Sequence, residues 1–535
     1  MRMAVNWLGL VSIGVFYIIV LGTGIWASRK SKREEKKCSG NRTTWVGGGY
    51  ILGSAEMVYD PTKGLVWAVA PLAFSMSLII GALFFVKPMR SKNYVTLMDP
   101  FQEKYGNKVS AVLFIPALIG DILWIACILG ALGGTVSVVM DIHSWLAVII
   151  SAAVAVLYTL MGGLYSVAYT DVIQLCFIIV GLWLCVPFIL ASPSSANFTV
   201  AAVTKLHQEP WIGRLELEDA GRWVEDILLL AIGGICYQAF YQRVLSTATD
   251  AQAKITCYAA AVFCPILGIP SILIGAVAAS TNWNQTSYGS PSPYEEGKAG
   301  MILPIALQHL CPFYLCCCRD VVRRLGSSVC PSQLGRNIFK NIIYKGASEK
   351  LILMAVKVSV VLCGTAGAGL AMTTSSVHLF WIISSDVLYC MMAPQVICIF
   401  YLSRWVNYLG ACFGFVLALL LRVLVGEPLI GLPDLMPLPW DKIQEDGTRY
   451  RLFPFRTAIL LITLGTIFLV SRLAECLFEK RKLGSEDETD ATSRLRTSST
   501  DNKPETTVLC YEFMAEIRFT AKPHQTFEKL SSCPR

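Results

Sequence analysis

Long apolar blocks are the feature that most constrains the fold of this chain. The clearest of them cover residues 11–26, 111–139, 146–160 and 458–470. A helix of about 18 or more apolar residues can cross roughly 30 Å of hydrocarbon. In lipid, only helices and closed barrels satisfy every backbone polar group, and blocks of this length indicate helices. We therefore predict an all-α, multi-pass membrane protein.

Composition agrees with this prediction and excludes other classes. Only 15% of the residues are charged, against about 25% in soluble proteins. Most of the 19 cysteines lie inside apolar blocks, where cysteine acts as a small hydrophobe, so we expect no disulfide framework. The run 316–318 lacks the ligand spacing of a metal site. The net charge of +8 resides in short loops and predicts orientation rather than nucleic-acid binding.

Loop charge and glycosylation sequons give one consistent topology. Basic residues cluster after the first block, around 87–108 and around 319–345, which places these loops in the cytoplasm. The sequons at Asn197 and Asn284 then fall outside, whereas the sequon at Asn41 stays inside and unused. We expect about thirteen spans, with the N-terminus outside and the C-terminus inside. The expected spans after the first are 44–59, 64–86, 110–139, 145–163, 172–190, 226–242, 255–279, 301–318, 351–372, 377–402, 409–425 and 457–473.

Three segments depart from plain apolar helix. Residues 44–50 read TWVGGGY, and three consecutive glycines either break the helix at a binding site or form a close packing surface. Residues 162–174 form an expected cytoplasmic turn, in which Asp171 starts a span and can simply cap it. Residues 233–246 combine a glycine pair, aromatic residues and a polar end within one span.

These segments resemble the sodium/solute symporter family. The likeness is carried by Gly-Gly-Leu followed by Thr-Asp and Gln in 162–174, and by Gln-Arg-Val-Leu at 242–245. Within the family, TWVGGGY, VKPMRSK at 86–92, LYSVAYTDV at 164–172 and STNWNQT at 280–286 are similar to the choline carriers rather than the sugar, iodide or vitamin carriers. The resemblance covers roughly 4–311 and 336–473.

The resemblance implies a fold and a substrate site. The fold is a LeuT-like core of inverted five-helix repeats around a central site. The implied substrate is choline, held by aromatic faces at Trp45, Trp124 and Tyr237, with Phe74 as an added face. The family has tryptophan at the position of Tyr237, so this residue departs from the pattern. Aromatic residues in spans more often pack or line the membrane interface, and only the family match favours a site.

The resemblance also implies ion coupling. Na⁺ would be bound by carbonyls of the first core helix, around Gly47 and Gly48, together with serine oxygens of the eighth, and Asp171 joins the coupling residues. Cl⁻ would be required as well. No prosthetic group, catalytic residue or metal site is expected, and we find no nucleotide loop or nucleophile elbow that would indicate an enzyme.

Two segments depart from the family. The cytoplasmic half of the first core helix is missing before Thr44, and 316–334 is polar and basic where the eighth core helix should be apolar. Codons for 318–330 can be chosen so that the next reading frame spells the family's Ser-Ser-Ala-Asp-Ser pattern. We therefore expect a shifted exon or a gene-annotation error at this aberrant segment.

Three functions stay open from the sequence. The first is a sodium- and chloride-dependent choline symporter of the plasma membrane, which by family resemblance serves acetylcholine synthesis at presynaptic terminals and synaptic vesicles. The second is a sodium-coupled carrier of another small organic solute, and the third is a non-transporting truncated variant. We expect a transmembrane domain at 1–473, with its core at about 44–402, and a disordered cytoplasmic tail at 474–535. The oligomeric state, including a homo-oligomer, is left open.

Overall fold

The computed structural model describes residues 48–92, 94–193, 197–245, 249–311, 348–374, 376–427, 431–443 and 449–496, with a few single residues between them. The chain forms two compact units, 1–474 and 475–535. The helices that shape the first unit are α2 (Gly48–Tyr59), α3 (Ala70–Ile80), α4 (Val86–Ser91), α5 (Asp99–Met140), α6 (Ser144–Leu190), α7 (Ala220–Gly233), α8 (Gln238–Leu245), α9 (Asp250–Ser280), α10 (Ile302–Leu310), α13 (Glu349–Ala371), α14 (Val377–Val387), α15 (Ala393–Tyr401), α16 (Tyr408–Val425) and the first part of α17 (Phe455–Arg496).

Shorter elements connect these helices. A π-helical turn, η2 (Gly81–Phe85), joins α3 to α4, and a second, η12 (Leu388–Met392), joins α14 to α15. A 3-10 turn, η6 (Gly234–Cys236), follows α7. The remaining 3-10 turns are η1 (Leu65–Trp67), η4 (Val200–Ala202), η5 (Leu217–Asp219), η7 (Trp283–Gln285) and η8 (Ala299–Met301), and a small antiparallel pair is formed by β1 (Lys442–Ile443) and β2 (Arg449–Tyr450).

Side-chain caps explain where several helices begin. The hydroxyl of Thr249 accepts a hydrogen bond from the Gln252 N–H at the start of α9, and Ser376 accepts one from the Leu379 N–H at the start of α14. Asn407 caps α16 in the same way. Each cap satisfies a backbone donor that the helix itself leaves free, which fixes the first residue of the helix.

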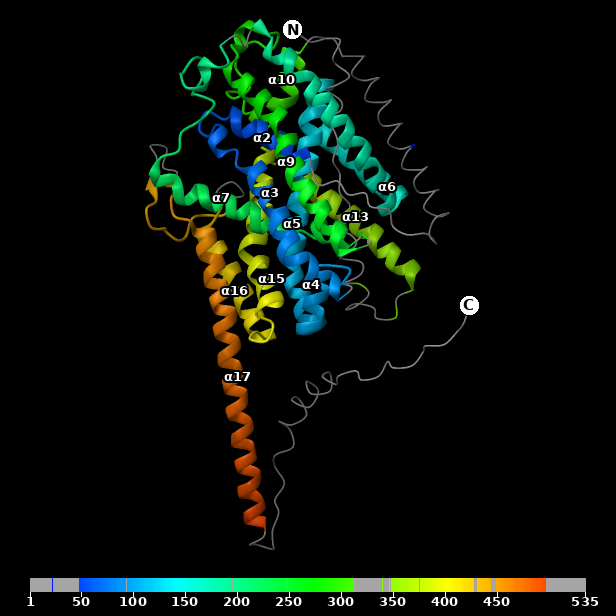
Figure 1. Ribbon diagram of the computed structural model, residues 1–535, viewed down its shortest axis with the longest axis vertical. Helices are drawn as coiled ribbons and strands as arrows, with labels where there is room; N and C mark the ends of the chain where they lie inside the picture. The colour runs from blue at the N-terminus through cyan, green and yellow to red at the C-terminus, as the bar shows by residue number, and fades with distance from the viewer. Residues whose placement is uncertain are drawn as a thin grey trace. The chain divides into compact units, whose positions relative to one another are not determined.

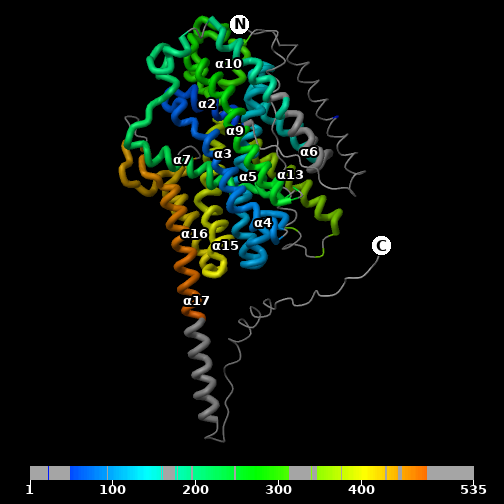
Figure 2. The backbone as a smooth tube through the Cα atoms, viewed as in Figure 1, coloured from blue at the N-terminus to red at the C-terminus, as the bar shows by residue number. Residues whose placement is uncertain are grey.

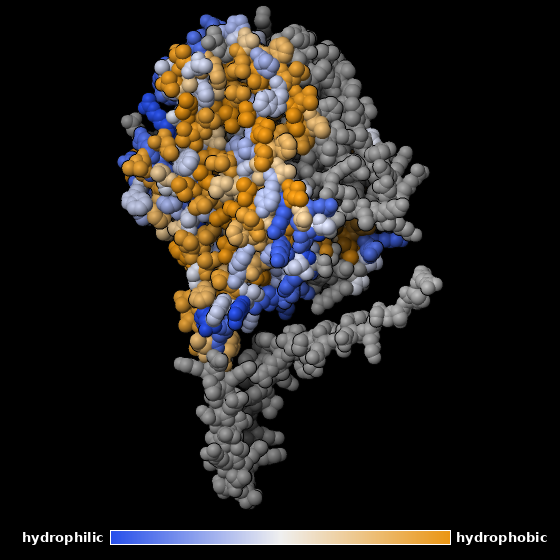
Figure 3. All heavy atoms as spheres, in the orientation of Figure 1, coloured by the Kyte–Doolittle hydropathy of each residue, from blue (hydrophilic) through white to orange (hydrophobic). Residues whose placement is uncertain are grey.

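Helix length and apolarity match the predicted fold class. In the part of the chain that the structure describes, seven helices are long and apolar enough to cross a membrane, and the bent pair around residue 237 adds an eighth. Two apolar parts of α6, 144–157 and 179–190, and the short apolar helix 299–310 fall on further expected spans. Figure 3 shows hydrophobic side chains over much of the visible face of the bundle, with hydrophilic ones gathered near α4. These findings confirm an all-α, multi-pass membrane protein.

The helices pack around α5 and α9. The first of these contacts α6, α13 and α14, and the second contacts α2 and α3 (Figures 1 and 2). A kink interrupts α5 at Gly106, whose φ of 80° is a conformation that side-chain-bearing residues rarely adopt. Two large buried apolar clusters fill the bundle, and both Phe74 and Trp124 pack against each of them.

The structure differs from expectation at two places. The expected turn around 162–171 is absent, because α6 runs as one helix from Ser144 to Leu190. Asp171 consequently lies inside a helix and cannot cap its start. The most helix-weakening residues near this point are glycines, which cost about 1 kcal/mol each, whereas a proline costs about 3 kcal/mol. The expected tail also begins within α17, which continues to Arg496.

Contacts between loops agree with the predicted topology. The Arg90 guanidinium, from an expected cytoplasmic loop, lies 2.6 Å from the Asp250 carboxylate and donates to the Val244 carbonyl, both in another expected cytoplasmic loop. At the C-terminal end of α2, the Gln208 side chain donates to the Tyr59 carbonyl, and the Tyr59 ring packs edge-on against Trp283. The loops that carry the two outside sequons therefore meet the same helix end.

That same end is held by main-chain pairing. The N–H groups of Leu65 and Val66 donate to the carbonyls of Trp211 and Ile212, at 2.8 and 3.0 Å. Gly64 and Gly213 lie back to back beside this pairing, and both have positive φ. We call residues 64–67 and 211–214 the paired strap.

We expect glycans on Asn197 and Asn284 and none on Asn41, which lies outside the described residues. Both predicted acceptor side chains are exposed, in loops at one end of the bundle. Glycosidase treatment of single Asn→Gln variants should remove one mobility shift for each of the two predicted sites. A glycan on Asn41 would contradict the orientation assigned to the first two spans.

Candidate functional site

A helix break carries the first residue of the candidate site. After α7 and η6, Tyr237 adopts an extended conformation with φ −71° and ψ 133°. The chain then turns by 51° into α8. The Gln238 side-chain oxygen accepts a hydrogen bond of 2.9 Å from the Leu97 N–H, which fixes the start of α8. Discontinuous helices place backbone groups and side chains at substrate sites in many transporters.

Five aromatic residues meet at this break, and we call them the aromatic cluster: Tyr50, Phe74, Trp124, Tyr237 and Trp381. Successive ring centroids are 5.3 Å apart for Tyr237 and Trp124, 6.3 Å for Trp124 and Trp381, 6.0 Å for Trp381 and Tyr50, and 6.4 Å for Tyr50 and Phe74. They come from α2, α3, α5, α14 and the break after η6. The structure thus brings together three of the predicted binding residues, Phe74, Trp124 and Tyr237.

Two members of the cluster were missed by the sequence reasoning. Tyr50 closes the TWVGGGY segment, and its hydroxyl donates to the Cys264 carbonyl at 2.8 Å. Trp381 is almost fully buried and touches both Tyr50 and Trp124. The glycine run beside Tyr50 was a usable signal, whereas nothing in the span that contains Trp381 distinguishes this residue from a packing aromatic.

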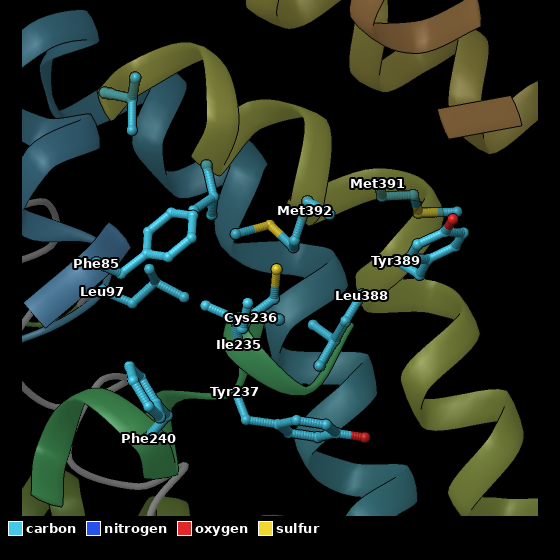
Figure 4. Close-up of a cluster of buried hydrophobic side chains, with 14 of the residues drawn as sticks. Phe85, Leu97, Ile235, Cys236, Tyr237, Phe240, Leu388, Tyr389, Met391 and Met392 are labelled. Atoms are coloured by element: carbon cyan, nitrogen blue, oxygen red, sulfur yellow. The ribbon is translucent and has the colours of Figure 1, made fainter. Parts of the chain in front are cut away.

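A chain of hydroxyl groups leads away from Tyr237. The Ser384 hydroxyl donates to the Gly120 carbonyl at 2.7 Å, and the Tyr237 and Ser384 oxygens are 2.6 Å apart. Because serine has one hydroxyl proton, Tyr237 must donate to Ser384. The Tyr237 oxygen can then accept from Ser385, at 3.2 Å. Figure 4 shows the Tyr237 ring extending from the break, with its hydroxyl far from Phe240 and Phe85.

The remaining predicted site residues are not placed at this site. Trp45 and Gly47 lie outside the described residues, and so does the aberrant segment 316–334. Gly48 is the first residue of α2. Asp171 is a residue of α6, and the structure describes its backbone but not its side chain. The sodium ring that these residues would form therefore stays a prediction.

A buried group of charges lies next to the hydroxyl chain, and we call it the arginine–carboxylate cluster: Glu225, Asp386, Arg422, Glu427 and Arg456. Arg422 Nη2 is 2.7 Å from both the Asp386 and the Glu427 carboxylates. Arg456 lies 3.4 Å from Asp386 and 3.5 Å from Glu225. The cluster links α7, α14, α16 and α17. The sequence reasoning missed it, although an ionisable residue such as Asp386 inside an apolar span is a functional signal by default.

Comparisons with known proteins agree with this geometry. The sequence model of the Sodium:solute symporter family matches residues 41–283. The chain is 43% identical to the human High affinity choline transporter 1 over 502 residues, which cover 89% of this chain and 86% of that protein. It is 41% identical to the transporter of that name from Torpedo marmorata, over 88% of this chain and 86% of the other. The Drosophila melanogaster relative is 38% identical, over 90% and 80%.

A solved structure shares the fold. It is a Na⁺-coupled sialic acid symporter in a substrate-bound, outward-open state, with a TM-score of 0.59 and 16% identity over 87% of this chain and 98% of that chain. The names of these relatives describe transporters rather than enzymes. On the strength of the relatives that it matches over most of their length, the chain belongs to the sodium:solute symporter family.

Proposed function

We propose that this protein is a choline carrier of the plasma membrane that is coupled to Na⁺, and that coupling requires the two segments that here depart from the family. The observation that carries the proposal is the aromatic cluster at the helix break. Choline is a permanent cation whose nitrogen has no proton to donate, so it is recognised by aromatic faces, at about 0.5–2 kcal/mol each. Trp124, Tyr237 and Trp381 present such faces from three different elements.

The relatives support the same substrate and coupling ion. Proteins named as choline transporters match nearly the whole chain, and the family is named for sodium-coupled solute transport. The requirement for Cl⁻, the role in acetylcholine synthesis, the presynaptic location and the outward-facing N-terminus rest on resemblance and loop charge.

A second candidate function is favoured by the sequence of 316–334. Arginines at 319, 323 and 324 stand where the family has an apolar core helix. Each arginine at the centre of a span costs about 2.5–3.5 kcal/mol on insertion scales. The chain as it stands would then be a non-transporting variant that keeps part of the substrate site, and the two candidates differ in coupled uptake rather than in binding.

Substitution of the aromatic cluster tests the substrate. We expect Trp124→Ala, like Trp45→Ala, to weaken choline binding about thirtyfold, because a desolvated cation–π contact of about 2 kcal/mol is lost. Tyr237→Trp should bind choline equally well or better, since indole presents the stronger face. Binding of radiolabelled choline to the full chain in lipid nanodiscs measures these effects.

Trp145→Ala is the matched control, because this tryptophan is exposed at the start of α6, away from the cluster. Its affinity should equal that of the unmodified chain. Equal affinities for the Trp124 and Trp145 variants would remove the aromatic cluster from the substrate site. Strong binding of a different solute, with none of choline, would favour another organic substrate.

A further inference from the structure

A buried carboxylate lies at one end of the aromatic cluster. Asp121 is 7% exposed and sits in α5, within a span. Ionisable groups inside membranes are costly, and they usually mark substrate paths or bind a partner charge. Residues three apart on a helix lie on the same face, so Asp121 neighbours Trp124, a member of the cluster.

The hydroxyl chain that starts at Tyr237 ends next to Asp121. The residue before Asp121, Gly120, accepts the hydrogen bond from Ser384, which in turn accepts from Tyr237. Ser384 thus joins the backbone next to Asp121 to the Tyr237 hydroxyl. This stretch of α5 is therefore beside two rings of the cluster, Trp124 and Tyr237, which come from different elements.

The other buried acids of the described ranges have different surroundings. Glu225, Asp386 and Glu427 face arginines. Glu56 accepts hydrogen bonds from the Ser376 hydroxyl and the His378 N–H. Asp121 differs from these four because it lies beside Trp124 and Tyr237, two of the rings proposed to hold a cation.

We infer that Asp121 supplies the negative charge that selects a cationic substrate over a neutral molecule of the same shape. The inference rests on the proposed function, since it assumes that a quaternary ammonium binds at the aromatic cluster. Aromatic faces attract a cation, but they also accept an uncharged tert-butyl group by apolar contact. A nearby carboxylate in a medium of low dielectric favours binding of the cation over the neutral molecule, because it attracts only the charged one.

The test compares choline with 3,3-dimethyl-1-butanol, its neutral isostere. Radiolabelled choline binding to the full chain in nanodiscs is measured directly, and competition by the isostere gives its affinity. We expect Asp121→Asn to weaken choline binding about tenfold or more, while the affinity for the isostere changes less than about twofold. Asp121→Glu should keep the preference for choline. Asp141→Asn, an exposed acid at the end of the same helix, is the matched control and should change neither affinity.

Each outcome has a distinct meaning. Equal weakening of both ligands by Asp121→Asn would assign Asp121 a packing role and overturn the inference, and so would unchanged choline affinity. A thermal melt of each variant shows whether binding is lost because the protein unfolds. If Asp121→Asn unfolds, the folded Asp121→Glu variant is the test, and a preference of that variant for the isostere overturns the inference. If the unmodified chain binds tetramethylammonium but no choline, the proposed substrate fails, and the same comparison with that cation still tests Asp121. If it binds no organic cation, the proposed function and the inference both fail.

Discussion

The chain as it stands should show no sodium-dependent choline uptake, and a variant with both aberrant segments restored to the family pattern should show it. A carrier that alternates between outward- and inward-open states uses ion binding to shift their populations. The ion does so only if its ring of oxygens is complete in one state. Here the cytoplasmic half of the first core helix, expected before Thr44, and the Ser-Ser-Ala-Asp-Ser pattern expected in the eighth core helix are missing from the sequence.

Radiolabelled choline uptake into cells, in sodium and in lithium medium, distinguishes the two chains. Surface biotinylation matches their expression, so a difference cannot come from the amount of protein. We expect sodium to raise uptake many-fold over lithium for the restored variant and not at all for the unmodified chain. Sodium-driven uptake by the unmodified chain would show that the two segments do not interrupt coupling.

Removal of Arg422 should be the most destabilising single change among those considered. Asp386 is 1% exposed and shares Arg422 with Glu427. Breaking a buried ion pair by removing one partner costs about 3–5 kcal/mol, because it leaves an uncompensated buried charge. Arg422→Met keeps much of the side-chain volume and removes the charge, so the loss is electrostatic rather than a cavity.

The measurement is the thermal stability of the purified protein in detergent, supported by its yield. Lys442→Met is the matched control, since Lys442 pairs with Glu218 on the surface, where such pairs contribute about 0–1 kcal/mol. The double variant Arg422→Met with Glu427→Gln should recover part of the loss, because Asp386 keeps Arg456 as a partner whereas Glu427 loses its arginine. Equal melting temperatures for the Arg422 and Lys442 variants would contradict a stabilising role for the buried charges.

Most of the spans that the structure describes could be predicted from sequence, because hydrocarbon thickness fixes the length of an apolar helix. The break at Tyr237 was also within reach, since Gly233 and Gly234 weaken the helix just before it. The partnership of Tyr50 with Trp381 was not, because their two helices are far apart in the chain and meet only through tertiary packing. The prediction of a turn before Asp171 was wrong for a local reason. Glycines permit a bend but do not impose one, and the neighbouring residues continue α6.

Ion-pair chemistry was the largest gap in the sequence reasoning. Arg422 and Arg456 lie near the ends of expected spans, where a basic residue is usually interpreted as part of a cytoplasmic loop. Their partner, Asp386, is inside a different span, and hydropathy alone treats it as a tolerated exception. Only the packing of α14 against the ends of α16 and α17 shows that these charges compensate one another.

The paired strap bears on how this family can diverge in sequence. Its hydrogen bonds join N–H and carbonyl groups, so they are indifferent to which side chains Leu65, Val66 and Trp211 carry. Substitution of these side chains would therefore leave the main-chain pairing intact, and its cost would come from the packing of Leu65, Val66 and Trp211 around Trp67. The glycines are the exception: a Cβ on Gly213 would lie 2.1 Å from the Lys63 carbonyl oxygen, and one on Gly64 would lie 2.5 Å from the Gly213 nitrogen. The strap thus constrains sequence change at two positions through its backbone and at the others through packing around Trp67.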